Sequence, residues 1–163
     1  MTAPLAPALT ESGLLLEQGA PAYAKHGLHA TYTVSAEALP RVARLFADHG
    51  YFLEMLTCLD ERAQTGKLRL IYTFNVFGPA DRHRVAANVD PGEEAPSITS
   101  IYSAADWNER EVFDMFGVRF AGHPNLKRLL LPEDATFHAL LKDFGRMDEG
   151  SEAPAKEKAH GHS

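Results

Sequence analysis

Apolar and polar residues alternate over several stretches of the chain, and a two-residue period of this kind predicts β-strands. The clearest stretch is 67–77, where every second residue from Leu68 to Val76 is apolar. Residues 51–60 are predicted to form a second strand, and Gly66 favours a hairpin turn between the two. Shorter strands are predicted at 29–34 and 83–89.

A helical period of apolar residues predicts the elements that flank these strands. Between Ser35 and His49 apolar side chains recur three to four residues apart, and Gly50 follows at a position where helices commonly end. Near the N-terminus, the three leucines at 14–16 are expected to lie in a short helix that ends near Gly19. A last helix is predicted over 104–117.

The order of these elements predicts an α+β fold, a two-layer domain with helices packed on a mostly antiparallel or mixed sheet. Residues 118–132 carry few helical or strand signals and at most a short element is expected at 136–144, so we expect an extended C-terminal arm over 118–144 after the last helix. A single domain is expected over 9–144, including this arm. It would follow a flexible N-terminal arm at 1–8 and precede a polar, disordered tail at 145–163.

Composition narrows the classes of function. The 163 residues are 45% hydrophobic, which suits one domain with a core, and the net charge is −6 without a basic stripe, which argues against nucleic-acid binding. The apolar runs are too short to span a bilayer, and an acidic chain is not expected to bind an anionic membrane unaided. A single cysteine, Cys58, and an N-terminus without a signal-peptide pattern predict a cytoplasmic location.

The predicted helix 104–117 mixes carboxylates with aromatic side chains. Glu109, Glu111 and Asp114 could in principle form an acid–base or metal site. Arg110 and Asp114 are four residues apart on the helix and can form an ion pair. Because neither face of this helix is uniformly apolar or charged, we favour a helix with one face on its own sheet and the other on a partner protein.

No motif for catalysis or cofactor binding occurs in the sequence. It lacks the nucleophile elbow G-x-S-x-G and the glycine-rich loops that bind phosphates. The histidines are scattered rather than set at metal-ligand spacing, and Cys58 is expected to be a buried apolar residue of a strand. We therefore predict no catalytic residue, no metal site and no cofactor in this chain.

A second unusual stretch, GHPNLKRLLLPED at 122–134, is both basic and apolar. It could be a loop packed across the chain's own sheet. It could also be an arm laid over a partner, with its leucines buried and its cations paired with acidic groups of that partner.

Together these stretches resemble the C (30 kDa) polypeptide of proton-pumping NADH:quinone oxidoreductase, respiratory complex I. The resemblance is carried by E-R-E-x-x-D-x-F-G, then G-H-P, then L-x-R-L-L-L-P-E-D. In this sequence the motif residues are Glu109, Arg110, Glu111, Asp114, Phe116, Gly117, Gly122, His123, Pro124, Leu126, Arg128, Leu129, Leu130, Leu131, Pro132, Glu133 and Asp134. It is strong over about 100–144 and extends back to about residue 28.

The resemblance implies a non-catalytic subunit of the peripheral arm, on the cytoplasmic side of the cell inner membrane, that touches the membrane only through the complex. It implies contact with the D (49 kDa) subunit, with the B and I subunits nearby, and iron–sulfur clusters and FMN in partner subunits. The chain would support assembly while electrons pass from NADH to quinone, coupled to proton translocation. As polar contacts between subunits or their local supports we expect Glu109, Arg110, Asp114, His123, Arg128, Lys142 and Asp143.

One segment departs from the family pattern, which usually continues with G-H-P-L-R-K-D-F/Y-P. At the corresponding positions this chain has Phe137, Ala139, Leu141 and Gly145 in place of Gly, Pro, Arg and Pro. A leucine cannot replace the planar set of donors of an arginine. The alternative is therefore the equivalent subunit of a complex I-like membrane-bound hydrogenase or of a ferredoxin or coenzyme F420 dehydrogenase. A stand-alone carboxylate-dependent hydrolase is the more distant alternative.

Overall fold

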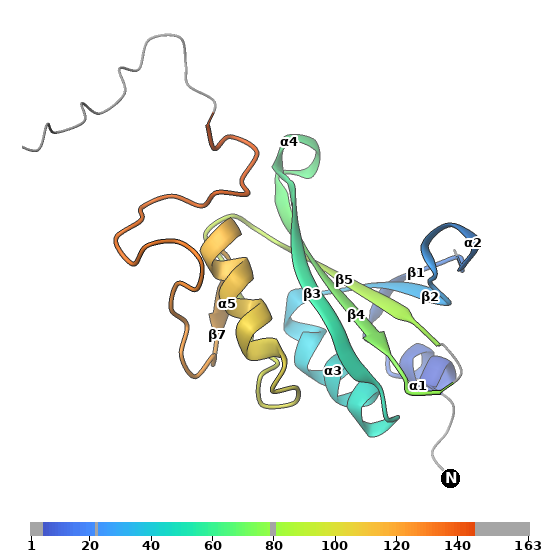
Figure 1. Cartoon of the computed structure of the whole chain (residues 1–163). Helices are drawn as coiled ribbons and strands as arrows, with labels where there is room; N and C mark the ends of the chain where they lie inside the picture. Colours follow the sequence, from blue (N-terminus) through green and yellow to red (C-terminus); the bar gives the residue numbers. More distant parts are fainter. Residues whose placement is uncertain (1–4, 22, 79–80, 146–163) are drawn as a thin grey trace, which may run out of the picture.

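The computed structural model describes residues 5–21, 23–78 and 81–145 (Figure 1). Its centre is a five-stranded mixed sheet with helices packed against it, which confirms the predicted α+β class. The strands of this sheet are β1 (Leu15–Gly19), β2 (Ala30–Val34), β3 (Phe52–Glu61), β4 (Lys67–Asn75) and β5 (His83–Val89).

The strand order is β1-β2-β5-β4-β3. Strands β2 and β5 are parallel, with Val34 opposite Ala87, and the other neighbours are antiparallel. The long hairpin of β3 and β4 turns through α4 (Arg62–Thr65), and Gly66 closes the turn with a φ of 76°. This positive φ costs glycine little, which is why the turn could be predicted from Gly66.

One face of the sheet carries the core. In β4, Leu68, Leu70, Tyr72 and Phe74 point into this core from every second position, as the two-residue period requires. Helix α3 (Leu39–Asp48), preceded by the 3₁₀ turn Ala36–Ala38, covers this face, and its Phe46 stacks on Phe74 of β4 with ring centroids 4.2 Å apart. The predicted helix is confirmed, although Ser35 precedes the 3₁₀ turn and the α-helix begins at Leu39.

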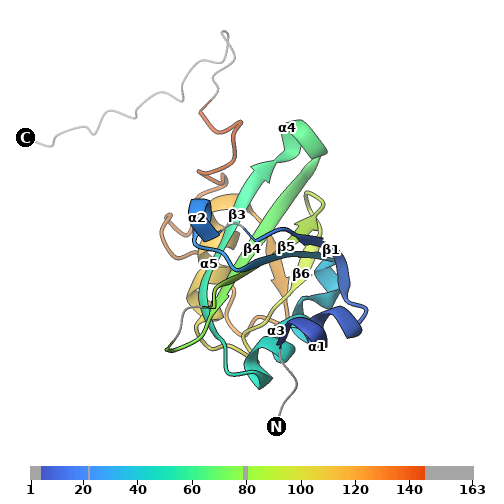
Figure 2. The same ribbon diagram turned by 90° about the vertical axis from the view of Figure 1, so that its right-hand side faces the viewer.

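The N-terminal prediction was wrong. The helix, α1 (Leu5–Glu11), lies before the three leucines and buries Leu5 and Leu9 next to α3 (Figure 2). Leu15 and Leu16 are the first residues of β1, which is an edge strand of the sheet because Leu15 pairs with Val34 of β2. Residues 5–8 of the predicted N-terminal arm thus belong to α1, whereas residues 1–4 and 146–163 lie outside the described residues. The short α2 (Tyr23–His26) follows β1.

The C-terminal half is organised around α5 (Ala105–Phe116), which lies beside β3 and buries Val112 against the core. Two short strands before and after this helix, β6 (Glu94–Pro96) and β7 (Arg119–Ala121), pair in parallel. From β7 the chain runs along α5 to the β3–β4 hairpin without a further helix or strand among the described residues (Figure 1). Residues 118–144 are called the arm below.

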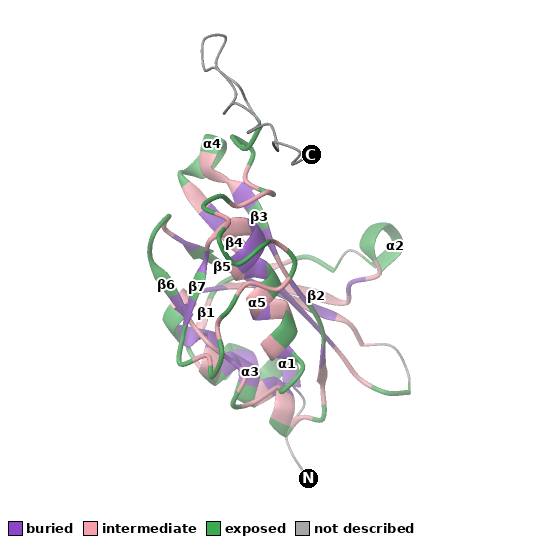
Figure 3. Ribbon diagram, turned by 60° about the vertical axis from the view of Figure 1, so that its left-hand side comes forward, coloured by how far each residue is buried: buried purple, intermediate pink, exposed green. Residues whose placement is uncertain are grey.

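The sheet, α5 and the arm differ in how far their side chains are buried. The inner face of the sheet and the side of α5 facing it are buried, whereas most of the arm is half-buried or exposed (Figure 3). No helix in the described part of the chain is long and apolar enough to cross a membrane. The arm is therefore a surface feature, and its polar contacts show how it is kept in place.

Candidate functional site

Asp114 of α5 lies at the centre of the contacts that attach the arm. Its side chain is fully buried. One carboxylate oxygen accepts hydrogen bonds from the backbone N–H groups of Leu129, Leu130 and Leu131 at 3.0, 2.7 and 2.9 Å. Burial alone would raise the pKa of Asp114, but these hydrogen bonds and that of Arg128 outweigh it and lower the pKa to about 2. The carboxylate is therefore ionised and holds the three leucines in one tight turn.

Arg128 fixes the start and the end of the same loop. Its Nη1 donates to the carboxylate of Asp114 at 2.6 Å, and its Nη2 donates to the backbone carbonyls of Ala135 and Phe137 at 2.5 and 3.3 Å. A planar guanidinium can serve these separate acceptors at once, which a lysine cannot. The loop 128–137 is thus closed around one arginine.

Arg110 does not form the ion pair expected from its spacing to Asp114. Its guanidinium donates to the backbone carbonyls of Lys127 and Arg128, both at 3.2 Å, and lies over the ring of Trp107 at 5.3 Å from the centroid. The pair is not formed because the Asp114 side chain points into the arm, where three backbone N–H groups and Arg128 bind its oxygens.

A second carboxylate, Asp60 at the end of β3, attaches the last part of the arm. Its oxygens accept hydrogen bonds from Arg62 and from the backbone N–H of Lys142 at 2.8 Å. Arg62 also reaches the exposed Asp143 with an N–O distance of 2.7 Å. The Arg62 guanidinium holds the pKa of Asp60 well below its usual range, and it also lowers the pKa of the exposed Asp143.

Glu109 lies in the N-terminal half of α5, and His123 of the arm contacts the first turn of the same helix. Glu109 is fully buried and accepts a hydrogen bond from the backbone N–H of Ile98 at 2.8 Å, while its second oxygen has no protein partner among the described residues. Burial raises the pKa of Glu109. His123 has a buried ring that accepts from the backbone N–H of Asn125 at 3.0 Å and bonds the carbonyl of Asp106 at 3.2 Å. It therefore shapes the turn at Gly122–Pro124.

Gly117 ends α5 at a φ of 79°, and the arm returns over it. A Cβ atom at this position would lie 2.8 Å from the ring of His138. That ring bonds the backbone carbonyl of Asp114 at 2.9 Å, and Leu140 N–H bonds the carbonyl of Met115 at 3.0 Å. Glycine is needed here for its φ and for the close approach of the histidine.

The structure thus places the seven residues expected from the sequence in three groups, each with contacts within the chain. Arg110, Asp114 and Arg128 form one network, Glu109 and His123 support the start of the helix, and the backbone of Lys142 with Asp143 joins the hairpin. Sequence reasoning missed Asp60, Arg62 and His138. Asp60 had a signal, since it occupies the inward register of Leu56 and Cys58 in β3, where a carboxylate needs partners.

Large apolar side chains remain exposed around these internal contacts. They are called the arm surface and comprise Trp107 of α5 with Leu130, Phe137, Leu140 and Phe144 of the arm. The aromatic rings of Phe137 and Phe144 stack with centroids 4.9 Å apart. Leu141, which stands at the family's arginine position, is half-buried and packs against the chain's own core. The departure from the family pattern therefore changes both the inner packing and the outer surface of this segment.

The same geometry bears on catalysis. Glu109 and Asp114 are each bound to backbone N–H groups of different segments, and Glu111 is exposed, so the three carboxylates do not converge. Within residues 5–21, 23–78 and 81–145 no group of three or more His, Cys, Asp or Glu side chains is placed to hold a metal ion. Cys58 is buried, and burial raises the pKa of its thiol to about 12, which disfavours a nucleophilic thiolate.

Comparison with known families agrees with the motifs. The profile of a family described as "Respiratory-chain NADH dehydrogenase, 30 Kd subunit" matches residues 32–149. The chain belongs to this family. The match covers the sheet from β2 onward, α5 and the whole arm, and it confirms the resemblance seen in the sequence.

Relatives of the chain carry the name of the C polypeptide of NADH-quinone oxidoreductase. The protein of Roseiflexus castenholzii is 38% identical over 117 residues, covering 68% of this chain and 66% of that protein. The protein of Rhodobacter capsulatus is 37% identical over 118 residues, covering 70% and 59%. That of Moorella thermoacetica is 43% identical over 103 residues, covering 62% and 68%. The chain therefore spans less than two thirds of the first two relatives.

Two solved structures share the fold. A chain of the membrane-bound sulfane sulfur reductase, an archaeal respiratory membrane complex, has a TM-score of 0.73 with 19% identity, covering 94% of this chain and 97% of that chain. A trypsin-resistant fragment of Nqo5 has a TM-score of 0.58 with 24% identity, covering 75% of this chain and 98% of the fragment. At these identities the likeness concerns the fold alone.

Proposed function

We propose that this chain is a non-catalytic peripheral subunit of an NADH:quinone oxidoreductase and that its arm surface docks a neighbouring subunit. The observation that carries the proposal is the contrast between the polar and the apolar side chains of the arm and its attachment. The polar groups of Asp114, Arg128 and Asp60 are used inside the chain, whereas large apolar side chains are left outside.

Exposure of such side chains supports docking. Leu130 and Phe144 are 62% and 50% exposed, and Trp107 is 63% exposed beside Arg110. Aromatic residues and arginine are enriched at protein interfaces, and clustered apolar exposure marks interaction sites. The internal hydrogen bonds order the arm before any partner arrives, which lowers the conformational entropy lost on binding.

Within the proposed assembly the chain contributes no electron carrier. FMN and iron–sulfur clusters would be held by partner subunits, and the D (49 kDa) subunit, with B and I nearby, is the proposed neighbour of the arm surface. The chain would then reach the cytoplasmic side of the inner membrane only through the complex. The names of the relatives, all subunits of a quinone oxidoreductase, support this assignment.

The experiment is a purification of the native complex through a tag on this chain, followed by mass spectrometry and an NADH:quinone activity assay. Leu130→Glu and Leu140→Glu should each reduce recovery of the partner subunits on the order of ten-fold, because a carboxylate would be buried in an apolar contact. Leu16→Glu is the matched control, since Leu16 is 71% exposed on β1, the opposite edge of the sheet. Full recovery with both arm variants would refute the docking role.

The altered segment 137–145 favours a second candidate, the equivalent subunit of a related membrane complex with another electron donor. Leu141 packs inward where the family pattern has an arginine, and Phe137 adds an aromatic ring to the surface. Assays of the purified complex with NADH, reduced ferredoxin, hydrogen and reduced F420 separate the candidates. Quinone reduction by NADH supports the first, whereas activity with another donor and none with NADH supports the second.

A further inference from the structure

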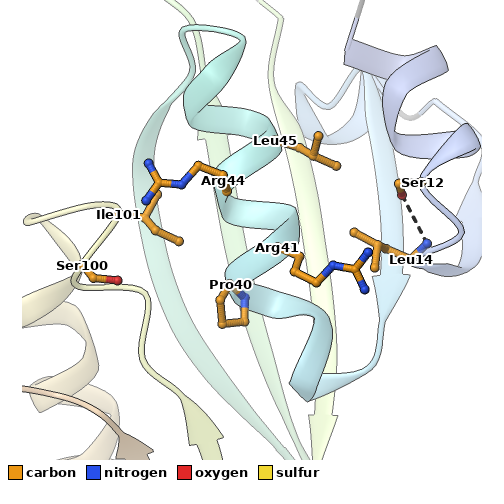
Figure 4. A pocket seen from close by; sticks show the side chains of 8 residues that line it. All are labelled: Ser12, Leu14, Pro40, Arg41, Arg44, Leu45, Ser100 and Ile101. Atoms are coloured by element: carbon orange, nitrogen blue, oxygen red, sulfur yellow. Dashed lines mark hydrogen bonds between the residues drawn. The ribbon is translucent and has the colours of Figure 1, made fainter.

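A groove of about 510 Å³ lies between α3 and the turn that precedes α5 (Figure 4). Its apolar lining consists of Leu14, Pro40, Leu45 and Ile101. The leucines and the isoleucine are half-buried residues packed against the core, so the groove exposes the edge of the core itself. It shares no lining residue with the arm surface and lies at the other end of the molecule from the β3–β4 hairpin tip.

Two arginines of α3 also line the groove. Arg41 and Arg44 are both exposed, and Figure 4 shows one guanidinium extending toward Leu14 and the other toward Ile101. Among the described residues neither guanidinium takes part in an ion pair or a side-chain hydrogen bond. Other arginines of this chain do form ion pairs with its own carboxylates; they are Arg62, Arg69, Arg82, Arg119 and Arg128.

We propose that this groove docks an acidic, leucine-bearing segment of a neighbouring subunit, a second contact that rests on the proposed membership in a complex. Charge complementarity carries the choice of occupant. The chain has a net charge of −6, yet this face presents two cations one helical turn apart, neither paired within the described part of the chain, beside an apolar floor. Two carboxylates spaced by one turn would meet both guanidinium groups, and an apolar side chain between them would cover the floor.

A protein segment fits this groove better than a small molecule or a lipid. The lining offers no buried polar side chain aimed at a ligand, since the hydroxyl of Ser12 is already engaged with the backbone of Leu9 and Leu14. An anionic membrane surface would be repelled by the remaining negative charge of the chain. Exposed arginines around an apolar floor are instead typical of protein interfaces.

The test uses the native complex carrying Arg41→Lys and Arg44→Lys. These changes keep both charges and add primary amines, so a zero-length carbodiimide reagent can join each to a carboxylate in contact with it. Mass spectrometry of the cross-linked complex identifies the peptide. Arg119→Lys is the chemical control, because Arg119 pairs with Glu94 at 3.0 Å and its lysine should cross-link within the chain.

The proposal predicts cross-links from positions 41 and 44 to acidic residues of one segment of an identified subunit. It predicts further that Arg41→Glu with Arg44→Glu weakens retention of that subunit on the order of ten-fold, and that exchanging the partner's carboxylates for lysines restores it. Arg119→Glu should leave retention unchanged. If lysines on the partner restore retention of the double glutamate variant, the loss of retention cannot be due to general damage to the fold.

Several results would overturn the proposal. One is the absence of any cross-link at 41 and 44 while position 119 reacts with Glu94. Others are cross-links only to a second copy of this chain or to its own residues 146–163, and binding to phosphatidylserine vesicles that disappears with the two glutamates. If the wild-type chain co-purifies with no other subunit, the proposed function fails as well. If the complex is intact and only the cross-links are missing, the groove assignment alone fails.

Discussion

Asp114 of α5 and Arg128 of the arm form an ion pair at 2.6 Å that is almost closed to solvent, with side-chain exposures of 0% and 12%. The pair lies in the same network as three backbone N–H groups of the arm, so a single carboxylate anchors a whole loop. Removing one member of a buried pair is costly because the other is left without compensation.

Asp114→Asn should therefore lower the free energy of unfolding by about 3 kcal/mol. The amide keeps the shape of the side chain but places N–H donors against N–H donors and leaves Arg128 unpaired. Urea unfolding of the two proteins at pH 7 measures the difference. Glu111→Gln on the exposed side of the same helix is the control, and it should change stability by less than about 0.5 kcal/mol. Equal effects of the two changes would contradict the anchoring role.

Acid should weaken the attachment of the arm as Asp114 loses its negative charge. The pKa of Asp114 is about 2 in the fold against an ordinary 3.8, so the folded state binds its proton less readily than the unfolded state. This contribution to stability is present above the ordinary pKa and is lost as the pH falls from about 4 to about 2. Asp60, whose pKa is also lowered, adds a loss of the same sign. Urea titrations between pH 6 and pH 2 should show a shallower slope for Asp114→Asn.

Glu109 should have the opposite pH dependence. Burial raises its pKa, so the folded state keeps a proton that the unfolded state releases, and stability falls as the pH rises above about 4.5 toward the folded pKa. Glu109→Gln removes this titration while the amide oxygen can still accept from Ile98. Its unfolding free energy should therefore lose this component of the decline between pH 4.5 and pH 7. A wild-type and a variant profile of identical slope would show that Glu109 ionises normally.

Gly117→Ala should release the returning part of the arm. Any residue with a Cβ costs about 1–2 kcal/mol at a φ near 79°, and the methyl group would in addition meet the ring of His138 at 2.8 Å. Gly66→Ala is the matched control, because its φ is 76° and nothing lies within 4 Å of the added carbon. Hydrogen exchange of residues 138–141 should rise for Gly117→Ala and not for Gly66→Ala. The same increase in both would assign the effect to the backbone alone.

Much of the fold could be predicted from periodicity. The strand at 83–89 has the predicted bounds, because its alternating apolar residues Val85, Ala87 and Val89 are buried. Helix α5 differs from the predicted helix by one residue at each end. The three leucines at 14–16 carry no such pattern. Their conformation is decided by pairing with β2, a contact between segments that the local sequence pattern does not reveal.

Some residues of the contacts that hold the arm were predictable from the sequence, whereas Asp60, Arg62 and His138 and the pairings were not. The family motifs pointed to Asp114 and Arg128. Helical spacing suggested Arg110 as the partner of Asp114, because residues four apart in sequence are neighbours on a helix. The actual partner lies 14 residues further along the chain, and Lys142 lies 82 residues from Asp60. Contacts across such separations depend on how the helix lies beside the hairpin.

The join between Asp60 of the hairpin and the backbone of Lys142 has a consequence for the order of events in the cell. Because the two residues are 82 positions apart, the end of the arm cannot form this hydrogen bond until β3, β4 and α5 have come together. A nascent or misfolded chain cannot display its arm in the finished arrangement. If the arm surface is what a neighbouring subunit recognises, recruitment itself becomes a checkpoint that admits only correctly folded copies.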